Sequence, residues 1–174
     1  GASLPGAGFR VLRADAQLLL VDKDSGLLTV PGRGPAKADC LISRLQAKGF
    51  PEVRHAPHRL DRDTSGLLAL GRTAEAHRAL AVQFQDRKVK KRYEALLWGW
   101  PAADAGEVDL PIGKVRARQG APARMAVVCG AAGGRGGAGA GGGIEPDSPG
   151  AEQARPCTTR WQVLARYETG QTLG

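Results

Sequence analysis

The sequence is poor in cysteine and has no hydrophobic run long enough to cross a membrane. Its three cysteines, Cys40, Cys129 and Cys157, are odd in number and form no CxxC pair, so neither a disulfide framework nor a cysteine-based metal site is expected. His55 and His58 lie three residues apart without a nearby cysteine or second histidine pair, which disfavours zinc. No segment of about 18 apolar residues occurs, so no membrane span is predicted. These absences favour a reducing, intracellular compartment.

Acidic residues are also in deficit. The 174-residue chain has 17 Asp and Glu against 25 Lys and Arg, a formal net charge of +8. A surplus of this size favours a polyanionic partner, and nucleic acid is preferred to a membrane because no lipid-facing segment accompanies the charge. The length is sufficient for one domain with a real core. We therefore expect a single nucleic-acid-binding domain with no membrane association.

One segment lacks almost every side chain that could build a core. Residues 130–143 contain nine Gly, four Ala and one Arg. Such a composition cannot bury enough apolar surface to offset the entropy of ordering it. We predict a disordered insertion over about 130–155, inside a domain, because strand-like sequence resumes after it.

The remaining sequence predicts strands interrupted by two helices. Apolar runs predict strands over residues 18–21, 27–30, 66–71 and 93–98, and a strict period of two predicts another over 159–167. Asp39 is the expected N-cap of a helix over about 40–48, and Thr73 that of a helix through about 86, with His77 on its packed face. Without sustained alternation of strand and helix, this order predicts an α+β fold with a mixed, mainly antiparallel sheet.

The stretch HRLDRDTSGLL, residues 58–68, is the richest in chemical groups. A carboxylate that looks buried is followed by Thr64-Ser65-Gly66 and then by an apolar strand. From these residues alone, the favoured interpretation is an Asx-type turn in which Asp61 or Asp63 caps nearby backbone amides. The alternative is a reactive carboxylate held at the mouth of a core strand.

A basic cluster follows the second predicted helix. One interpretation is an ordinary solvated charge run. The cluster leads directly into a predicted strand, however, and an anchored cluster loses less entropy on binding phosphate. We therefore predict phosphate contacts here, from Arg87, Lys88, Lys90, Lys91 and Arg92.

Together these segments resemble the RluA-type family of pseudouridine synthases. The resemblance rests on HRLDRDTSGLLALGR with the TAEAHRAL helix and KKRYEALLWG, and on LLLVDKDSGLLTVPG, DLPIG and ARPCTTRWQVL in the same order. It covers about residues 11–128 and 154–173. It implies a catalytic domain over residues 11–174, with a curved mixed sheet and a central cleft.

The resemblance implies that uridines in RNA, in rRNA or tRNA, are isomerised to pseudouridine without a metal or organic cofactor. By motif, Asp61 matches the family's catalytic aspartate, Tyr93 its active-site tyrosine, and Arg59 lies in the RNA-facing loop. A carboxylate could attack C1′, stabilise an oxocarbenium ion or remove a ribose proton, and these alternatives stay open. Arg59 and Arg62 flank the carboxylate and could hold it ionised or fill the space left by a flipped base. Asp63 is expected to make a structural or capping contact. Tyr93 would stack on the extruded base.

The sequence departs from the family at its end. Members continue into a TGRTHQ-like motif, which residues 169–172 echo without the Arg and His. We therefore expect the chain to end before the motif and, alone, to have little activity. Two alternatives are a non-catalytic RNA-binding relative and a base-excising glycosidase. A monomer with RNA as its partner is expected.

Overall fold

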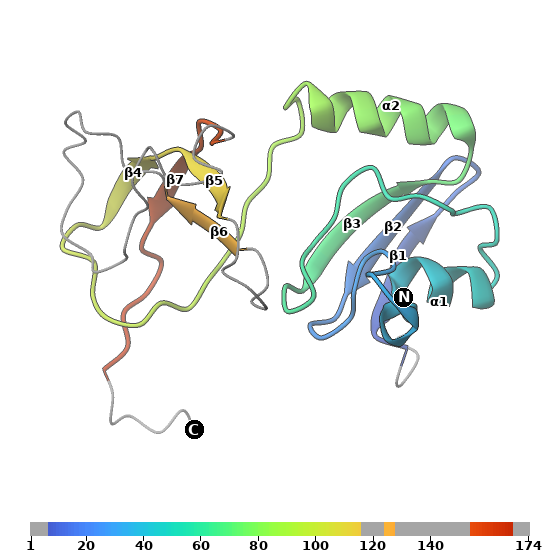
Figure 1. Ribbon diagram of the computed structural model, residues 1–174, viewed down its shortest axis with the longest axis horizontal. Coiled ribbons are helices and arrows are strands. Elements are labelled where there is room, and N and C mark those ends of the chain that lie inside the picture. Colours follow the sequence, from blue (N-terminus) through green and yellow to red (C-terminus); the bar gives the residue numbers. More distant parts are fainter. Residues whose placement is uncertain (1–6, 116–123, 128–153, 169–174) are drawn as a thin grey trace. The chain divides into compact units, whose positions relative to one another are not determined.

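The computed structural model describes residues 7–115, 124–127 and 154–168. The chain divides into two compact units, Gly1–Glu94 and Ala95–Gly174 (Figure 1). The segment predicted to be a disordered insertion, about 130–155, lies almost wholly outside the described residues, as does the echo of the family motif at 169–172. None of the helices in the described ranges is long and apolar enough to span a membrane.

The first unit is built on a three-stranded antiparallel sheet. Its strands are β1 (Phe9–Ala14), β2 (Leu18–Lys23) and β3 (Gly66–Gly71), in the order β1-β2-β3. The central strand β2 lies beside β3, which follows the loop of residues 58–65, here called the HRLD loop (Figure 1). Two of the three strands, β2 and β3, were predicted from their apolar runs.

The core lies on one face of this sheet. Residues of β2 alternate between partly and fully buried, so that Leu19, Val21 and Lys23 point into the same interior. Leu68 and Leu70 of β3 point the same way. The apolar core is completed by helix α1 and loop residues; it comprises Ala7, Phe9, Leu19, Val21, Leu27, Cys40, Leu41, Ile42, Leu45, Val53, Leu60, Leu68 and Leu70.

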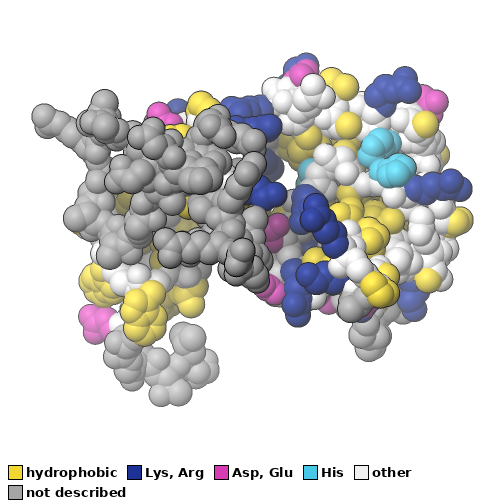
Figure 2. Space-filling view, viewed as in Figure 1, with side chains coloured by type: hydrophobic (Ala, Val, Ile, Leu, Met, Phe, Trp, Pro, Cys, Tyr) yellow, Lys and Arg dark blue, Asp and Glu magenta, His cyan; other side chains and the backbone are white. Residues whose placement is uncertain are grey.

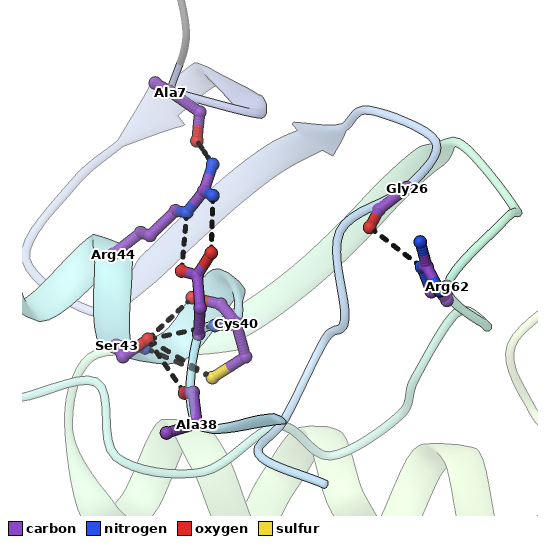
Figure 3. Close-up of polar contacts among 8 residues, drawn as sticks. Ala7, Gly26, Ala38, Cys40, Ser43, Arg44 and Arg62 are labelled. Atoms are coloured by element: carbon purple, nitrogen blue, oxygen red, sulfur yellow. Dashed lines mark hydrogen bonds and ion pairs between the residues drawn. The ribbon is translucent and has the colours of Figure 1, made fainter. Parts of the chain in front are cut away.

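Helix α1 (Leu41–Ala47) confirms the predicted first helix but begins at a different cap. The N-cap is Cys40, which forms a capping box with Ser43. Asp39, the predicted cap, instead accepts two hydrogen bonds from Arg44 at 2.7 and 2.6 Å, and Arg44 also donates to the carbonyl of Ala7 (Figure 3). Because the guanidinium of Arg44 binds the Asp39 carboxylate with two hydrogen bonds, Asp39 does not cap the helix.

The predicted strand over residues 27–30 is wrong. The carbonyls of Leu28 and Thr29 accept hydrogen bonds from the amides of Leu41 and Ile42 at the start of α1, at 2.7 and 3.3 Å. These residues therefore supply acceptors to orphan amides of a helix N-terminus rather than to a neighbouring strand. Strand β1, which pairs with β2 in their place, was not predicted.

Helix α2 (Ala74–Gln85) starts as predicted, with the Thr73 side chain accepting from the amide of Ala76 at 3.1 Å. It packs along β3 without burying any residue fully. His77, Leu80 and Phe84 are all partly buried on its covered face, as the sequence predicts. The helix is therefore an outer layer of the unit rather than a part of its core.

Close packing of α2 on β3 depends on Gly71. A Cβ at this position would lie 2.5 Å from the Cα of His77 and 2.8 Å from the carbonyl carbon of Ala76. Because both are backbone atoms, the helix would have to move. We expect Gly71→Ala to lower the free energy of unfolding by about 1 to 3 kcal/mol, measured by urea denaturation. An unchanged midpoint would show that α2 moves freely on the sheet.

The second unit contains two antiparallel pairs in its described residues. Strand β4 (Ala105–Asp109) pairs with β7 (Thr158–Gln162), and β5 (Ile112–Val115) pairs with β6 (Arg124–Val127). The strand predicted over 159–167 is thus confirmed only in its first part. Strands β4, β5 and β6 were not predicted. The α+β class is confirmed, and all strand pairs within the described residues are antiparallel.

The strand predicted over residues 93–98 is also wrong. This segment is extended but unpaired within the described ranges, and its large apolar side chains are exposed: Leu96 is 88% and Trp98 95% exposed. A strand needs a hydrogen-bonded neighbour as well as an apolar run, and the run alone does not supply one.

Candidate active site

The HRLD loop joins the core to β3. Leu60 is buried, whereas the side chain of the next residue, Asp61, is 86% exposed. The carboxylate is therefore presented to solvent, and the prediction that it is buried is wrong. Leu60 occupies the inward position in the loop, so the following side chain points outward.

The carboxylates of this loop do not cap it. The turn is closed by a backbone bond from the amide of Thr64 to the carbonyl of Asp61 at 3.2 Å. In the described part of the chain neither Asp61 nor Asp63 accepts a hydrogen bond from a backbone amide, so the favoured self-capping interpretation is wrong. Each makes only a loose ion pair: Arg59 Nη2 lies 3.8 Å from Asp61 Oδ1, and Arg62 Nε lies 3.9 Å from Asp63 Oδ1.

The backbone around Asp61 is fastened to the segment that follows β2. The carbonyl of Arg62 accepts from the amide of Gly26 at 2.8 Å, and Arg62 Nε donates back to the carbonyl of Gly26 at 3.3 Å (Figure 3). Ser25 Oγ donates to the carbonyl of Asp63 at 2.9 Å. The backbone that carries the exposed carboxylate is thus held immediately after Asp61.

His58 begins the loop and connects it to two other elements. Its Nε2 accepts a hydrogen bond from the amide of Ala69 in β3 at 3.0 Å, and its ring stacks on Phe84 of α2 with centroids 4.0 Å apart. Burial, with a smaller contribution from the positive charge of Lys91, lowers the pKa of His58 below its ordinary value. His58 therefore ties the start of the loop to β3 and α2.

This environment predicts a loss of stability in mild acid. The folded state holds His58 neutral, so as pH falls below about 6.5 the unfolded chain takes up a proton that the folded chain does not. The free energy of unfolding should fall by up to about 1.4 kcal/mol per pH unit for this one proton, until the lowered pKa is reached. His58→Gln keeps an acceptor for Ala69 and should lose less stability between about pH 7.5 and 5. Equal pH dependence of wild type and variant would contradict the assignment; His55→Gln is the matched exposed control.

The basic cluster, residues 87–92, starts in a strained backbone conformation. Arg87 has φ +56°, and the amides of Arg87 and Lys88 donate to the carbonyls of Phe84 and Gln83 at 3.2 and 2.9 Å. This pattern is a Schellman motif with Arg87 at the left-handed position that glycine normally occupies. The start of the cluster is therefore fixed to the end of α2.

The side chains of the cluster are exposed except for Val89. Lys88 forms an ion pair with Asp86 at 3.0 Å, and Lys90, Lys91 and Arg92 form none within the described residues. Figure 2 shows Lys and Arg side chains at several places on the visible face of the first unit, with fewer Asp and Glu between them. The charge of this segment is thus largely available to an external anion.

Tyr93 follows the cluster directly. Its side chain is 62% exposed, and it makes no hydrogen bond among the described residues. The structure therefore brings Arg59 to Asp61, but within the described residues it joins Tyr93 to Asp61 by no polar contact. A free aromatic face at this position remains able to stack on a planar ligand.

Two residues that contact this loop were not predicted from the sequence. Lys23 and Thr29 are both buried, at 0% and 2% exposure, and both contact the backbone beside Asp61. Lys23 could have been found, because it follows Leu19 and Val21 at inward positions of a strand, where a charged residue is unusual. Thr29 carries no comparable signal.

No group of three or more His, Cys, Asp or Glu in the described ranges is arranged to hold a metal ion. His55 and His77 lie side by side, with ring centroids 5.9 Å apart, but without a third ligand of that kind. The described site is thus built from a carboxylate, arginines and a nearby basic segment.

The sequence profile of the RNA pseudouridylate synthase family matches residues 17–170. The dual-specificity RNA pseudouridine synthase RluA of Yersinia pestis is 44% identical over 102 residues, covering 59% of this chain and 48% of that protein. The RluA of Pasteurella multocida is 34% identical over 166 residues, covering 93% of this chain and 62% of that protein. The chain therefore spans about half to three-fifths of the length of these relatives.

Solved structures give the same picture of the fold. Human RNA pseudouridylate synthase domain containing 4 aligns with a TM-score of 0.61 and 23% identity, over 90% of this chain and 54% of that chain. Human RNA pseudouridylate synthase domain containing 1 aligns with a TM-score of 0.62 and 22% identity, over 91% and 54%. At this identity the likeness concerns the fold alone.

Proposed function

The chain belongs to the RNA pseudouridylate synthase family, in its RluA-type branch, and from this we propose that it isomerises uridine in RNA to pseudouridine with Asp61 as the catalytic carboxylate. The observation that carries the proposal is the exposed Asp61 carboxylate on an anchored loop, beside Arg59 at 3.8 Å. An accessible carboxylate can contact a bound nucleotide, whereas a carboxylate that is buried or caps its own turn cannot.

The reaction defines what Asp61 must do. The bond between C1′ and N1 breaks, the uracil turns, and C5 bonds to C1′ with loss of the hydrogen on C5. An ionised carboxylate can attack C1′, stabilise positive charge on the ribose or remove a ribose proton. Arg59 places a positive charge 3.8 Å from the carboxylate that all three roles use. The reaction as proposed needs no metal or organic cofactor.

RNA binding is assigned to the arginines of the loop and to the basic cluster, residues 87–92. Arg59 and Arg62 are more than 60% exposed, and the cluster lies beyond the end of α2 with most of its charges unpaired in the described structure. Tyr93 is proposed to stack on the base extruded from the RNA. Arg62, whose Nε already bonds Gly26, is proposed to contact RNA through the rest of its guanidinium.

The substrate and setting are proposals of the same kind. The relatives are named dual-specificity RNA pseudouridine synthases, and we propose rRNA or tRNA as the substrate here. We propose that residues 11–174 form part of one catalytic domain, acting as a monomer. Free Cys40 and Cys157 support a reducing compartment.

The test is direct detection of pseudouridine. The full-length protein is incubated with rRNA and tRNA in buffer containing a chelator, and pseudouridine is mapped by chemical modification and primer-extension stops. New stops at defined uridines are expected without an added cofactor. RNA binding without any new stop would favour the non-catalytic relative, and abasic sites in place of pseudouridine would favour the glycosidase.

A further inference from the structure

The segment from Lys23 to Thr29 holds the backbone on both sides of Asp61 through two buried side chains. Thr29 hydrogen-bonds to the backbone of Leu60, immediately before Asp61, and Lys23 hydrogen-bonds to the backbone of Arg62, immediately after it. Between these two points the one polar contact of the Asp61 side chain with the described residues is the 3.8 Å ion pair with Arg59.

Thr29 secures the residue before Asp61. Its hydroxyl donates to the carbonyl of Leu60 at 2.7 Å and accepts from the amide of Leu60 at 3.2 Å. Both backbone groups of Leu60 thereby depend on one buried hydroxyl, since Thr29 is 2% exposed. A side chain of the same shape without oxygen would leave both groups unpaired in the interior.

Lys23 secures the residue after Asp61. Its ammonium donates to the carbonyls of Leu27, Asp24 and Arg62 at 2.7, 3.0 and 3.2 Å, which uses all three of its N–H groups. The residue is fully buried and forms no ion pair with any described carboxylate. Burial lowers its pKa, while the negative charges of Asp24, Asp63 and Asp61 oppose that shift.

A buried ammonium without a carboxylate partner is costly, because desolvation is offset only by hydrogen bonds and by more distant charges. The other inward positions of β2, Leu19 and Val21, are apolar, so Lys23 is the exception on this face. An apolar residue could not donate to the carbonyl of Arg62 in the loop that carries Asp61.

We propose that Lys23 and Thr29 are positioning residues for Asp61: they fix the backbone of Arg62 and Leu60 so that the carboxylate is held in its reactive place. The inference rests on the proposed function of Asp61. Neither residue touches the substrate, so both should act on the rate of the chemical step rather than on the binding of RNA.

Thr29→Val is the decisive variant because it is nearly isosteric. In the full-length protein we expect kcat to fall at least about 10-fold while KM for RNA stays within about 3-fold, since misplacing a reacting group lowers the rate steeply. Thr29→Ser restores the hydroxyl and should recover most of kcat. Lys23→Met, which removes charge and donors at similar length, should act in the same direction.

A control separates positioning from stability. Thr73→Val also removes a hydroxyl that binds a backbone amide, but at the cap of α2. It should lower the melting temperature and leave kcat unchanged. Hydrogen exchange measured by mass spectrometry adds a readout independent of catalysis: exchange in a peptide covering residues 58–66 should quicken in Thr29→Val and not in Thr73→Val.

The inference would be overturned if Thr29→Val had the kcat of the wild type, or if the variant changed KM alone. Hydrogen exchange in residues 58–66 at the wild-type rate would overturn it as well. If Lys23→Met does not fold, Thr29→Val decides alone. Failure of the proposed function is distinguishable, because the wild type would then form no pseudouridine or Asp61→Asn would form it at the wild-type rate, whereas exchange in residues 58–66 still reports on Thr29.

Discussion

Asp61→Asn is expected to reduce pseudouridine formation by at least about 1,000-fold in the full-length protein, with RNA affinity within a few-fold of wild type. The substitution keeps the size of the side chain but removes its charge and basicity. Because the Asp61 side chain is 86% exposed and caps no described backbone amide, the loss cannot be attributed to unfolding of the loop. Single-turnover rates at saturating RNA measure the effect.

Asp63→Asn is the matched control for this prediction. Asp63 lies two residues away, its side chain is 88% exposed, and it has a similarly loose ion pair at 3.9 Å. Its loss should change the rate by no more than a few-fold, because a structural carboxylate contributes nothing to the transition state. Equal losses in both variants would indicate a general electrostatic effect of the loop, and near-wild-type activity of Asp61→Asn would remove the catalytic assignment.

The second large effect is expected in the basic cluster. Replacing Lys88, Lys90 and Lys91 together by glutamine should weaken RNA binding about tenfold or more at low salt, and flatten its salt dependence. Each lost phosphate contact removes about 0.7 to 0.9 from the slope of log affinity against log salt, or about 2 to 3 for three contacts. The measurement is a filter-binding or fluorescence titration at several salt concentrations.

The control carries the same change in net charge elsewhere on the first unit. Arg33, Lys37 and Lys48 are exposed residues outside the cluster, and their joint replacement by glutamine should leave the slope nearly unchanged. If both triple variants lower the slope equally, RNA is attracted by overall charge and residues 87–92 are an ordinary solvated surface. Lys88 should contribute less than the others, because Asp86 already pairs with it at 3.0 Å.

Sequence reasoning succeeded where the signal is local. Helix α2 was predicted because Thr73 caps it and its apolar spacing is helical, and β3 because its apolar run is bounded by glycines. It failed where the structure of a segment depends on a hydrogen-bonding partner elsewhere in the chain. Residues 27–30 bond to α1 instead of forming a strand, and residues 93–98 are apolar but have no partner strand in the described structure.

The same distinction holds at the site. The motif singled out Asp61, but the residues alone predicted a buried carboxylate, and the structure exposes it beside the buried Leu60. Lys23 and Thr29 bind that loop across 39 and 31 residues of sequence. Contacts at such separation depend on the pairing of β2 with β3, and the local sequence pattern does not predict which strands pair.

The most direct test of the account follows the hydrogen on C5 of the substrate uridine. Forming the bond between C5 and C1′ expels this hydrogen, so RNA labelled with tritium at C5 should release tritium to water during the reaction. The full-length wild-type protein should release one equivalent per modified uridine, Asp61→Asn essentially none, and Asp63→Asn the wild-type amount. Release by Asp61→Asn at the wild-type rate, or none by the wild type on RNA that it binds, would contradict the central claim that Asp61 carries out uridine isomerisation.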